Sequence, residues 1–221
     1  MFHWLEQRPF FFAVLVSFMI AFAGIVETVP DFAKSSQPLV GQKPYTILEL
    51  TGRHVYIKDS CNACHSQLIR PFKSETDRYG MYSLSGEYAY DRPFLWGSKR
   101  TGPDLHRIGN YRTTDWHEGH MRAPSEIVPG TVMPAYPHMF TNIADFETAY
   151  AEAITVRDIF GTPYDQEGMP KIGTLEEAKA IALQEAKLIV ADMKDQDVKD
   201  KVAQGEIPEI VAIIAYMNSL K

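Results

Sequence analysis

The chain contains two cysteines, Cys61 and Cys64, and both lie in the stretch Asp59–Pro71, which reads DSCNACHSQLIRP. His65 follows the second cysteine directly. A C-x-x-C pair can form a redox dithiol, half of a zinc site or the attachment point of a haem. The adjacent histidine favours haem, because two thiols can add to the two vinyl groups of one haem edge while the imidazole lies under the iron. We therefore predict one covalent haem c, bound by Cys61, Cys64 and His65.

Zinc and dithiol chemistry are the alternatives for this motif. A zinc site needs two further ligands, and His117 and His120, which are spaced H-x-x-H, could complete a Cys2His2 set. A thioredoxin-like dithiol would need a strand before the motif. The preceding residues 46–60 have the pattern of an amphipathic helix instead, so both alternatives are less favoured than haem.

A haem with one histidine ligand needs a second axial ligand or keeps an open site. Met133 is the first candidate, because the prolines and glycine of the segment 128–134 (VPGTVMP) hold an extended loop that cannot become helical. Such a loop can place one thioether on iron at little ordering cost. Met169 is the alternative, with a histidine ligand or an open site also left open, whereas Met217 lies in a helical apolar stripe and is predicted to be core. His/Met ligation raises the potential of a c-type haem and suits electron transfer.

Three basic residues are candidates for contacts with the haem propionates. Arg70 closely follows the haem motif, and Lys99 and Arg100 lie in the segment 96–105, WGSKRTGPDL. A guanidinium group matches a carboxylate with two parallel hydrogen bonds. An ordinary basic pair on the surface is the alternative for Lys99 and Arg100.

The elements that would position this site begin with an apolar N-terminal segment. Residues 10–26 read FFFAVLVSFMIAFAGIV and contain no charged side chain. At about 1.5 Å per residue such a run spans about 25 Å, close to the hydrocarbon thickness of a bilayer. We predict a single transmembrane anchor within residues 1–30, ending at Pro30. A cleaved signal peptide with Arg8 in its n-region is the alternative.

The orientation of this anchor does not follow from its flanking charges, because Arg8 precedes it while Lys34 and Lys43 follow it. Glu27 lies near the end of the apolar run. It either reaches the lipid interface or contacts a partner subunit within the membrane.

The remainder of the chain predicts a mainly α fold. Residues 31–46 are expected to form a linker, and residues 47–221 a cytochrome c domain. In the final segment 207–221, IPEIVAIIAYMNSLK, apolar residues recur on one helical face. Small c-type cytochromes cross their N- and C-terminal helices at a glycine–aromatic contact, and Gly52 and Tyr56 offer such a pair.

Two regions lie between these terminal helices. Residues 72–132 are rich in Tyr, Gly and Pro with little periodicity, so we expect long loops around the haem. Residues 142–160 and 173–204 have helical patterns, the second opened by a capping box at Thr174. We interpret residues 141–206 as a helical insertion with a solvated outer face, or with an acidic docking face as the alternative.

Composition excludes two classes of protein. The 221 residues carry a formal net charge of −6, which argues against nucleic-acid binding, since a polyanion binder usually presents a basic face. Two cysteines also cannot form a disulfide scaffold.

Several ordered stretches together resemble one family, the mono-haem subunit (subunit II) of cbb3-type cytochrome c oxidases, which are bacterial haem–copper terminal oxidases. The resemblance covers roughly residues 10–140 and the final helix. It is carried by these stretches: IVETVP, GRHVYIKDSCNACHSQLIRPF, ETDRYG, YDRPFLWGSKRTGPDLHRIG, DWH and VPGTVMPAYP. The chain departs from the family in two places. Thr51 stands where many relatives have an acidic residue, and the 141–206 insertion fits the family less clearly.

The resemblance implies a class I cytochrome c domain in the periplasm, behind an inner-membrane anchor whose N-terminus is cytoplasmic. It implies that Cys61 and Cys64 carry the haem, with His65 and Met133 as axial ligands. Electrons would come from another c-type cytochrome subunit and pass to a haem b of the haem–copper catalytic subunit, which reduces O2 to water with proton pumping. The WGSKRTGPDL loop would contact that subunit near a bound calcium ion, with Ser98 as a candidate ligand.

Three other functions remain as alternatives at this point. The chain could be a stand-alone membrane-anchored electron shuttle, the cytochrome subunit of a nitric oxide reductase-like complex, or a haem sensor with a labile distal ligand. Copurifying haem proteins would separate the oxidase subunit from the shuttle. Rapid binding of CO would indicate a sensor.

Overall fold

The computed structural model describes residues 2–33, 37–97 and 100–221. Within these ranges the chain consists of helices and loops without a strand, and its β-type pairing is an isolated bridge between Ile143 and Pro208. This confirms the predicted mainly α fold. The α-helices are α1 (Phe2–Glu6), α2 (Pro9–Ala33), α3 (Ile47–Lys58), α4 (Lys73–Tyr79), α5 (Thr114–Arg122), α6 (Pro124–Ile127), α7 (Phe146–Phe160), α8 (Leu175–Ala191), α9 (Gln196–Ala203) and α10 (Glu209–Ser219). Short 3-10 turns are η1 (Cys61–Ala63), η2 (Ser85–Tyr88), η3 (Ile108–Asn110) and η4 (Pro137–Phe140).

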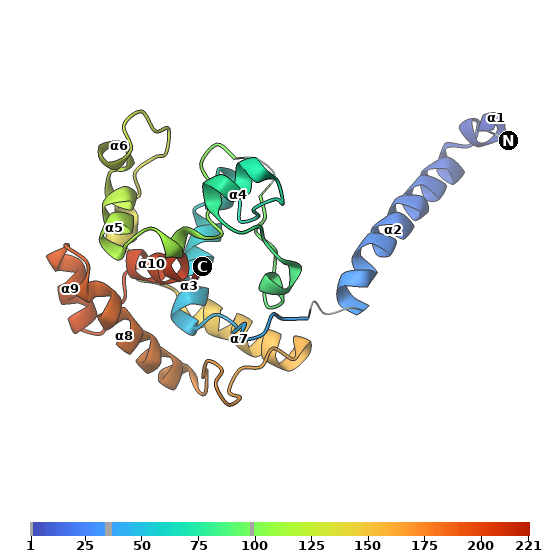
Figure 1. Cartoon of the computed structure of the whole chain (residues 1–221). Coiled ribbons are helices and arrows are strands. Elements are labelled where there is room, and N and C mark those ends of the chain that lie inside the picture. Colours follow the sequence, from blue (N-terminus) through green and yellow to red (C-terminus); the bar gives the residue numbers. More distant parts are fainter. Residues whose placement is uncertain (1, 34–36, 98–99) are drawn as a thin grey trace.

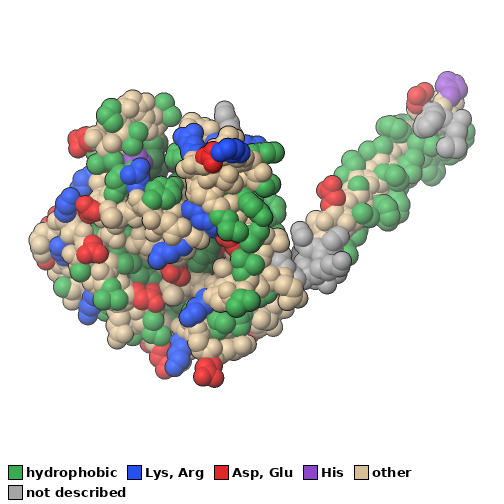
Figure 2. Space-filling view, in the orientation of Figure 1, with side chains coloured by type: hydrophobic (Ala, Val, Ile, Leu, Met, Phe, Trp, Pro, Cys, Tyr) green, Lys and Arg blue, Asp and Glu red, His purple; other side chains and the backbone are tan. Residues whose placement is uncertain are grey.

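Helix α2 is the apolar N-terminal element. Its segment Pro9–Val29, 21 residues, is long and apolar enough to cross a membrane, and none of it is buried against the rest of the chain. Figures 1 and 2 show it extending from the folded domain with hydrophobic side chains along its visible surface. The helix continues to Ala33, three residues past the predicted end at Pro30, while its apolar membrane-length segment ends at Val29. A proline removes one backbone donor but still permits a final turn to follow. The helix fits a single membrane anchor.

Helices α3 and α10 cross at the centre of the domain (Figure 1). At their closest point a Cβ atom on Gly52 would lie 1.9 Å from the carbonyl oxygen of Ala212 and 2.9 Å from Cβ of Tyr216. Only glycine therefore permits this approach. The rings of Tyr56 and Tyr216 meet edge to face with centroids 5.6 Å apart. The predicted crossing of the terminal helices at a glycine–aromatic contact is confirmed.

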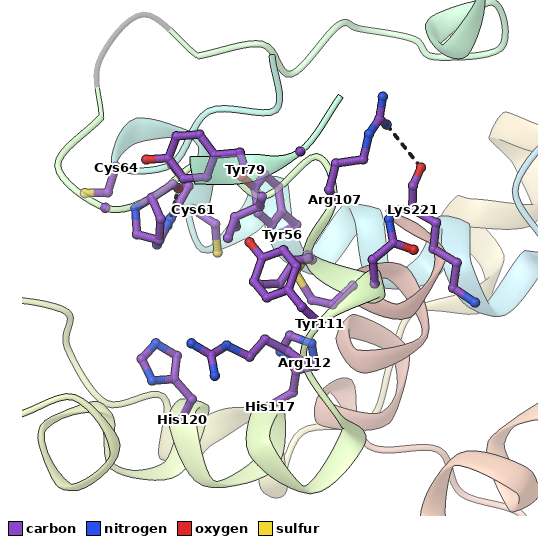
Figure 3. A pocket seen from close by; sticks show the side chains of 18 of the residues that line it. Tyr56, Cys61, Cys64, Tyr79, Arg107, Tyr111, Arg112, His117, His120 and Lys221 are labelled. Atoms are coloured by element: carbon purple, nitrogen blue, oxygen red, sulfur yellow. Dashed lines mark hydrogen bonds between the residues drawn. The ribbon is translucent and has the colours of Figure 1, made fainter. Parts of the chain in front are cut away.

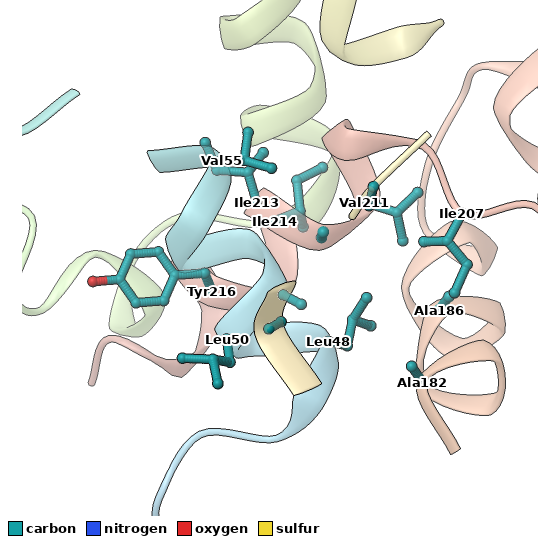
Figure 4. Close-up of a cluster of buried hydrophobic side chains, with 14 of the residues drawn as sticks. Leu48, Leu50, Val55, Ala182, Ala186, Ile207, Val211, Ile213, Ile214 and Tyr216 are labelled. Atoms are coloured by element: carbon teal, nitrogen blue, oxygen red, sulfur yellow. The ribbon is translucent and has the colours of Figure 1, made fainter. Parts of the chain in front are cut away.

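The hydrophobic core surrounds this crossing. Figure 4 shows Leu48 and Val55 of α3 facing Val211 and Ile214 of α10. Helix α8 packs against both central helices through a stripe of small residues that are almost fully buried, namely Ala178, Ala182 and Ala186. Small side chains at helical spacing let α8 come close without leaving voids.

Helices α7 and α8, within the segment 141–206 predicted as an insertion, cover the side of the core that lies away from α4, and the loop between α8 and α9 contacts α5 (Figure 1). Thr174 and Glu177 form the predicted capping box at the start of α8. The stretch 173–204, predicted as one helical segment, is divided into α8 and α9. The division occurs because the Asp195 side chain accepts the backbone N–H of Val198 at 3.0 Å and begins a new helix.

Long loops make up much of the described part of residues 72–132, as predicted, but the short helices α4, α5 and α6 and the 3-10 turns η2 and η3 interrupt them. Of these, α5 matters most for the site. Its sequence, TDWHEGHMR, contains few apolar residues, so the apolar periodicity that reveals a helix was absent.

Candidate functional site

A cavity of about 1210 Å³ opens beside the C-x-x-C-H motif. Cys61, Cys64 and His65 line it, and Figure 3 shows the two cysteines on one side of the space and His117 and His120 of α5 on the other. Much of the remaining lining is apolar or aromatic: Leu39, Val40, Tyr56, Tyr79, Leu105, Ile108, Trp116 and Tyr136. The lining is therefore suited to a large group with an apolar body.

The two thiols are free, with Cys61 buried and Cys64 exposed. Burial raises the pKa of the Cys61 thiol to about 12. Reactive dithiols instead depend on a lowered thiol pKa, which supplies the nucleophilic thiolate at neutral pH. The environment of Cys61 therefore disfavours dithiol redox chemistry.

The zinc alternative also lacks support from the geometry. His117 and His120 line the same cavity as the cysteines. In the part of the chain that the structure describes, however, no three His, Cys, Asp or Glu side chains gather closely enough to hold a metal ion. A Cys2His2 zinc site needs four such ligands around one point.

The His65 ring is held by the segment 101–104. Its Nδ1–H donates to the carbonyl oxygen of Pro103 at 2.8 Å, which leaves Nε2 unprotonated and able to bind a metal. Burial lowers the pKa of His65, so the ring is neutral near pH 7. A Cβ atom on Gly102 would lie 2.4 Å from Cε1 of His65. Gly102 therefore packs directly against the imidazole.

The two described basic residues that sequence suggested for the propionates, Arg70 and Arg100, both bind Glu75. Arg100 donates to Glu75 at 2.7 Å and to the Ser66 hydroxyl at 2.6 Å, and Arg70 forms an ion pair with Glu75. Asp104 accepts the Ser66 hydroxyl at 2.6 Å. Within the described ranges, neither arginine is among the residues that line the cavity. This network instead fastens the segment after the haem motif to the loop that holds His65.

Ser98 and Lys99 lie outside the described residues. Among the described residues, the basic side chains that do line the cavity are Arg78, Arg107, Arg112 and Lys221, together with one carboxylate, Glu87. The lining is thus positive in a chain whose net charge is −6. Sequence reasoning missed these residues because they are scattered along the loops and give no motif.

Arg107 and Arg112 differ in their partners. Arg107 donates to Glu87 at 2.9 Å and to the backbone oxygen of Lys221 at 3.1 Å, a contact that Figure 3 marks. Arg112 lies over the Trp116 ring, 4.3 Å from its centroid. In the described part of the chain no carboxylate lies within ion-pair distance of Arg112, so its charge is available to a bound anion.

Three polar atoms of the lining residues are buried without a hydrogen-bond partner among the described residues. They are the Tyr56 hydroxyl, Nε2 of His117 and Nδ1 of His120. Burial lowers the pKa of His117 to about 4, so the ring is neutral. An unpaired buried polar atom is costly. These atoms therefore fit a site that binds a partly polar group.

Four methionines line the cavity: Met81, Met121, Met133 and Met217. Met121 and Met217 are 7% and 2% exposed and belong to the packed core, whereas Met81 is 59% exposed. Met133 is half-buried, and its N–H donates to the Thr131 hydroxyl at 3.2 Å. Within the described ranges, Met169 is not part of this lining.

Comparison with protein families adds one result. A family model described as "Cytochrome C oxidase, mono-heme subunit/FixO" matches residues 2–221, and the match therefore includes the 141–206 insertion. No curated protein matches the chain.

Proposed function

The chain belongs to the family of mono-haem cytochrome c oxidase subunits, FixO, and from this we propose that it carries one haem c on Cys61 and Cys64 and passes electrons to the catalytic subunit of a bacterial terminal oxidase. The observation that carries the proposal is the shared cavity. The C-x-x-C-H motif, Met133 and a set of basic side chains all line it. The family name supports an oxidase complex and a single haem, and the covalent attachment is our inference from the cysteines.

His65 and Met133 are the proposed axial ligands. When bound, the haem would supply a one-electron iron couple whose potential is raised by thioether ligation. The chain's own residues prepare that site. The hydrogen bond from Nδ1–H of His65 to Pro103 orients the ring and strengthens Nε2 as a ligand. The apolar lining limits water.

The propionates would be bound by Arg112 and His117. Vinyl and propionate groups lie on opposite halves of the haem ring. A tether at Cys61 and Cys64 therefore directs the propionates to the far side of the cavity. Arg112 has no carboxylate partner among the described residues, and Nε2 of His117 is buried and unpaired. A guanidinium and an imidazole N–H are suitable donors for a carboxylate.

The partners and topology follow from the family and remain part of the proposal. The electron acceptor would be the haem b of the haem–copper subunit, and the donor another c-type cytochrome subunit. Helix α2 would cross the bacterial inner membrane with its N-terminus in the cytoplasm, placing the haem domain in the periplasm, where haem c is attached. A calcium ion near Ser98 at the contact with the catalytic subunit is included, although this residue lies outside the described ranges.

Purification from membranes in mild detergent tests the proposal. We expect a covalent haem, a near-infrared band of thioether ligation, and copurification with a haem–copper subunit that consumes O2. A chain that leaves the membrane with no other haem protein would instead be an electron shuttle. Reduction of nitric oxide by the copurified complex would indicate the reductase-like alternative, and rapid CO binding by the isolated subunit would indicate a sensor.

A further inference from the structure

Helix α5 has one face toward the cavity and another toward the loop between α8 and α9. Trp116, His117, His120 and Met121 line the cavity. Asp115, Glu118 and Arg122 follow one another at helical spacing on the opposite side, where all three contact the loop between α8 and α9. The helix is thus the element that joins the cavity to the 141–206 insertion.

Glu118 makes the central contact. Its side chain is almost fully buried, at 4% exposure. One carboxylate oxygen accepts the backbone N–H of Lys194 at 2.6 Å, and the other accepts the backbone N–H of Asp195 at 2.7 Å. Hydrogen bonds to a charged group are about twice as strong as neutral ones. A buried carboxylate with both oxygens occupied by backbone donors therefore fixes the distance between α5 and this loop.

Two ion pairs support the same contact from the surface. Arg122 pairs with Asp195, and Lys194 lies 3.3 Å from Asp115. Exposed pairs of this kind contribute little individually. They surround Glu118, however, and limit rotation of α5 about that anchor.

Helix α5 also contacts both ends of the loop that carries Met133. The backbone N–H of Tyr136 donates to the carbonyl oxygen of Met121 at 2.9 Å. Ile127 packs against Gly119 on the same helix, 3.3 Å from where a Cβ atom would stand. The loop that carries Met133 begins after Ile127 and ends at Tyr136, so both of its ends are attached to α5.

We propose that Glu118 is a positioning residue, through which the insertion holds α5 and thereby the Met133 loop against the cavity. The insertion contributes no side chain to the cavity lining within the described residues. Its role is to hold α5, whose side chains do line the cavity. This inference rests on the proposed function for the identity of the bound group, but the mechanical contact does not depend on it.

The test compares Glu118→Gln with Glu177→Gln in the full-length subunit in detergent. Glutamine at 118 places an amide N–H2 opposite a backbone N–H and removes the charge. Glutamine at 177 weakens the capping box that Thr174 and Glu177 form at the start of α8. This capping box lies in the same insertion but does not contact α5. Both variants weaken the insertion, so a purely structural effect would appear in both.

The first readout is hydrogen exchange of residues 114–136. We expect Glu118→Gln to accelerate exchange there, and Glu177→Gln to accelerate it only within α8. Unchanged exchange in residues 114–136 of Glu118→Gln, or equal acceleration in both variants, would overturn the brace. Because exchange does not require haem, this result is independent of the proposed function. A wild-type subunit lacking covalent haem would instead overturn the proposed function alone.

The second readout is the rate at which CO binds the reduced subunit, which rises when the distal ligand is less firmly held. For Glu118→Gln we expect an increase of about tenfold or more, the change associated with one lost charge-assisted hydrogen bond. For Glu177→Gln the rate of CO binding should stay within about twofold of wild type, since the contact that this variant removes belongs to α8 and not to α5. If Glu118→Gln does not accumulate, the double variant Asp115→Asn/Arg122→Gln removes both ion pairs that surround Glu118, and unchanged exchange of residues 114–136 in that variant would contradict the proposal.

Discussion

The two sides of the cavity differ in how firmly the chain holds them. One side, the tether side, carries Cys61, Cys64 and His65. There the backbone N–H groups of Thr101 and Gly102 both donate to the carbonyl oxygen of Cys64 at 2.9 Å. Leu105 donates to Ser66 at 2.8 Å. His65 is held in addition by its own ring hydrogen bond. The segment after the motif is thus fastened to the 101–105 loop at several consecutive residues.

The Met133 side has fewer contacts of its own. Val132 is 80% exposed, and a Cβ atom added to Gly130 would meet no atom within 4 Å. The hydrogen bonds of this loop are local, from Thr131 to Val128 and from Met133 to Thr131, until Tyr136 reaches α5. Its position therefore depends on α5.

This difference indicates that the two ligands are controlled separately. The fold orients His65 through adjacent backbone, so disturbance there should impair haem attachment and proximal ligation. The Met133 loop is positioned at a distance, so disturbance there should change potential and ligand exchange while the haem stays attached.

The largest expected effect comes from Gly102→Ala. The new Cβ would lie 2.4 Å from Cε1 and 2.8 Å from Nδ1 of His65, so the ring must move from its hydrogen bond with Pro103. We expect loss of the low-spin spectrum or of covalent haem, measured by visible spectroscopy and haem staining of denatured protein.

Gly130→Ala is the matched control on the other side. Its φ of +79° makes alanine unfavourable by about 1 kcal/mol, but no atom lies in its way. Equal damage from both substitutions would remove the distinction between the two sides of the cavity.

Met133→Leu should have the next largest effect. Leucine keeps the apolar volume but cannot ligate iron, so covalent haem should remain while the midpoint potential falls. The near-infrared thioether band should disappear. Met169→Leu is the control, and an unchanged spectrum in Met133→Leu with a changed one in Met169→Leu would reverse the assignment.

Sequence reasoning succeeded where a local pattern reports a local structure. The capping box at Thr174, the apolar run of α2 and the glycine–aromatic crossing at Gly52 each depend on residues a few positions apart. The C-x-x-C-H motif is equally local, and the structure places all three of its residues on one cavity.

Prediction from sequence was weaker where partners are distant along the chain. Arg70 and Arg100 were attractive because they flank haem-binding stretches, but Glu75 takes both, and a pairing across loops leaves no spacing to recognise. Arg112 was missed because a single arginine in a loop gives no motif, and Glu118 was missed because α5 lacks apolar periodicity. Their contacts arise only when the loops and the insertion fold around the core.

Glu75→Gln should have a moderate, pH-dependent effect on the tether side. Hydrogen bonds from Arg100, reinforced by Arg70, lower the pKa of Glu75 from 4.5 to about 2. A lowered pKa in the folded state means that the contribution is complete above pH 4.5 and is lost as pH falls toward 2. At pH 7 the substitution should reduce the free energy of unfolding by about 2 kcal/mol, the range of a charge-assisted hydrogen bond.

Urea denaturation at pH 7 and pH 3 measures this effect. The difference between wild type and Glu75→Gln should narrow at pH 3, since the wild-type carboxylate is then losing its advantage. A constant difference at both pH values would mean that packing, and not the charge network, supplies the stability.

The smallest expected effect is that of Thr131→Val on the Met133 loop. Valine keeps the side-chain shape but removes the oxygen that accepts the N–H of Met133 at 3.2 Å. One neutral hydrogen bond is worth about 1 kcal/mol, so CO binding to the reduced subunit should accelerate by about fivefold or less, without loss of haem. Thr141→Val removes a comparable exposed hydroxyl contact, to the carbonyl oxygen of His138, and should leave the rate unchanged. If Thr131→Val instead caused loss of the Met133 ligand, the local hydrogen bond of the loop would be what positions Met133. Helix α5 would then not position this loop, and the two sides of the cavity would not differ in the way described above.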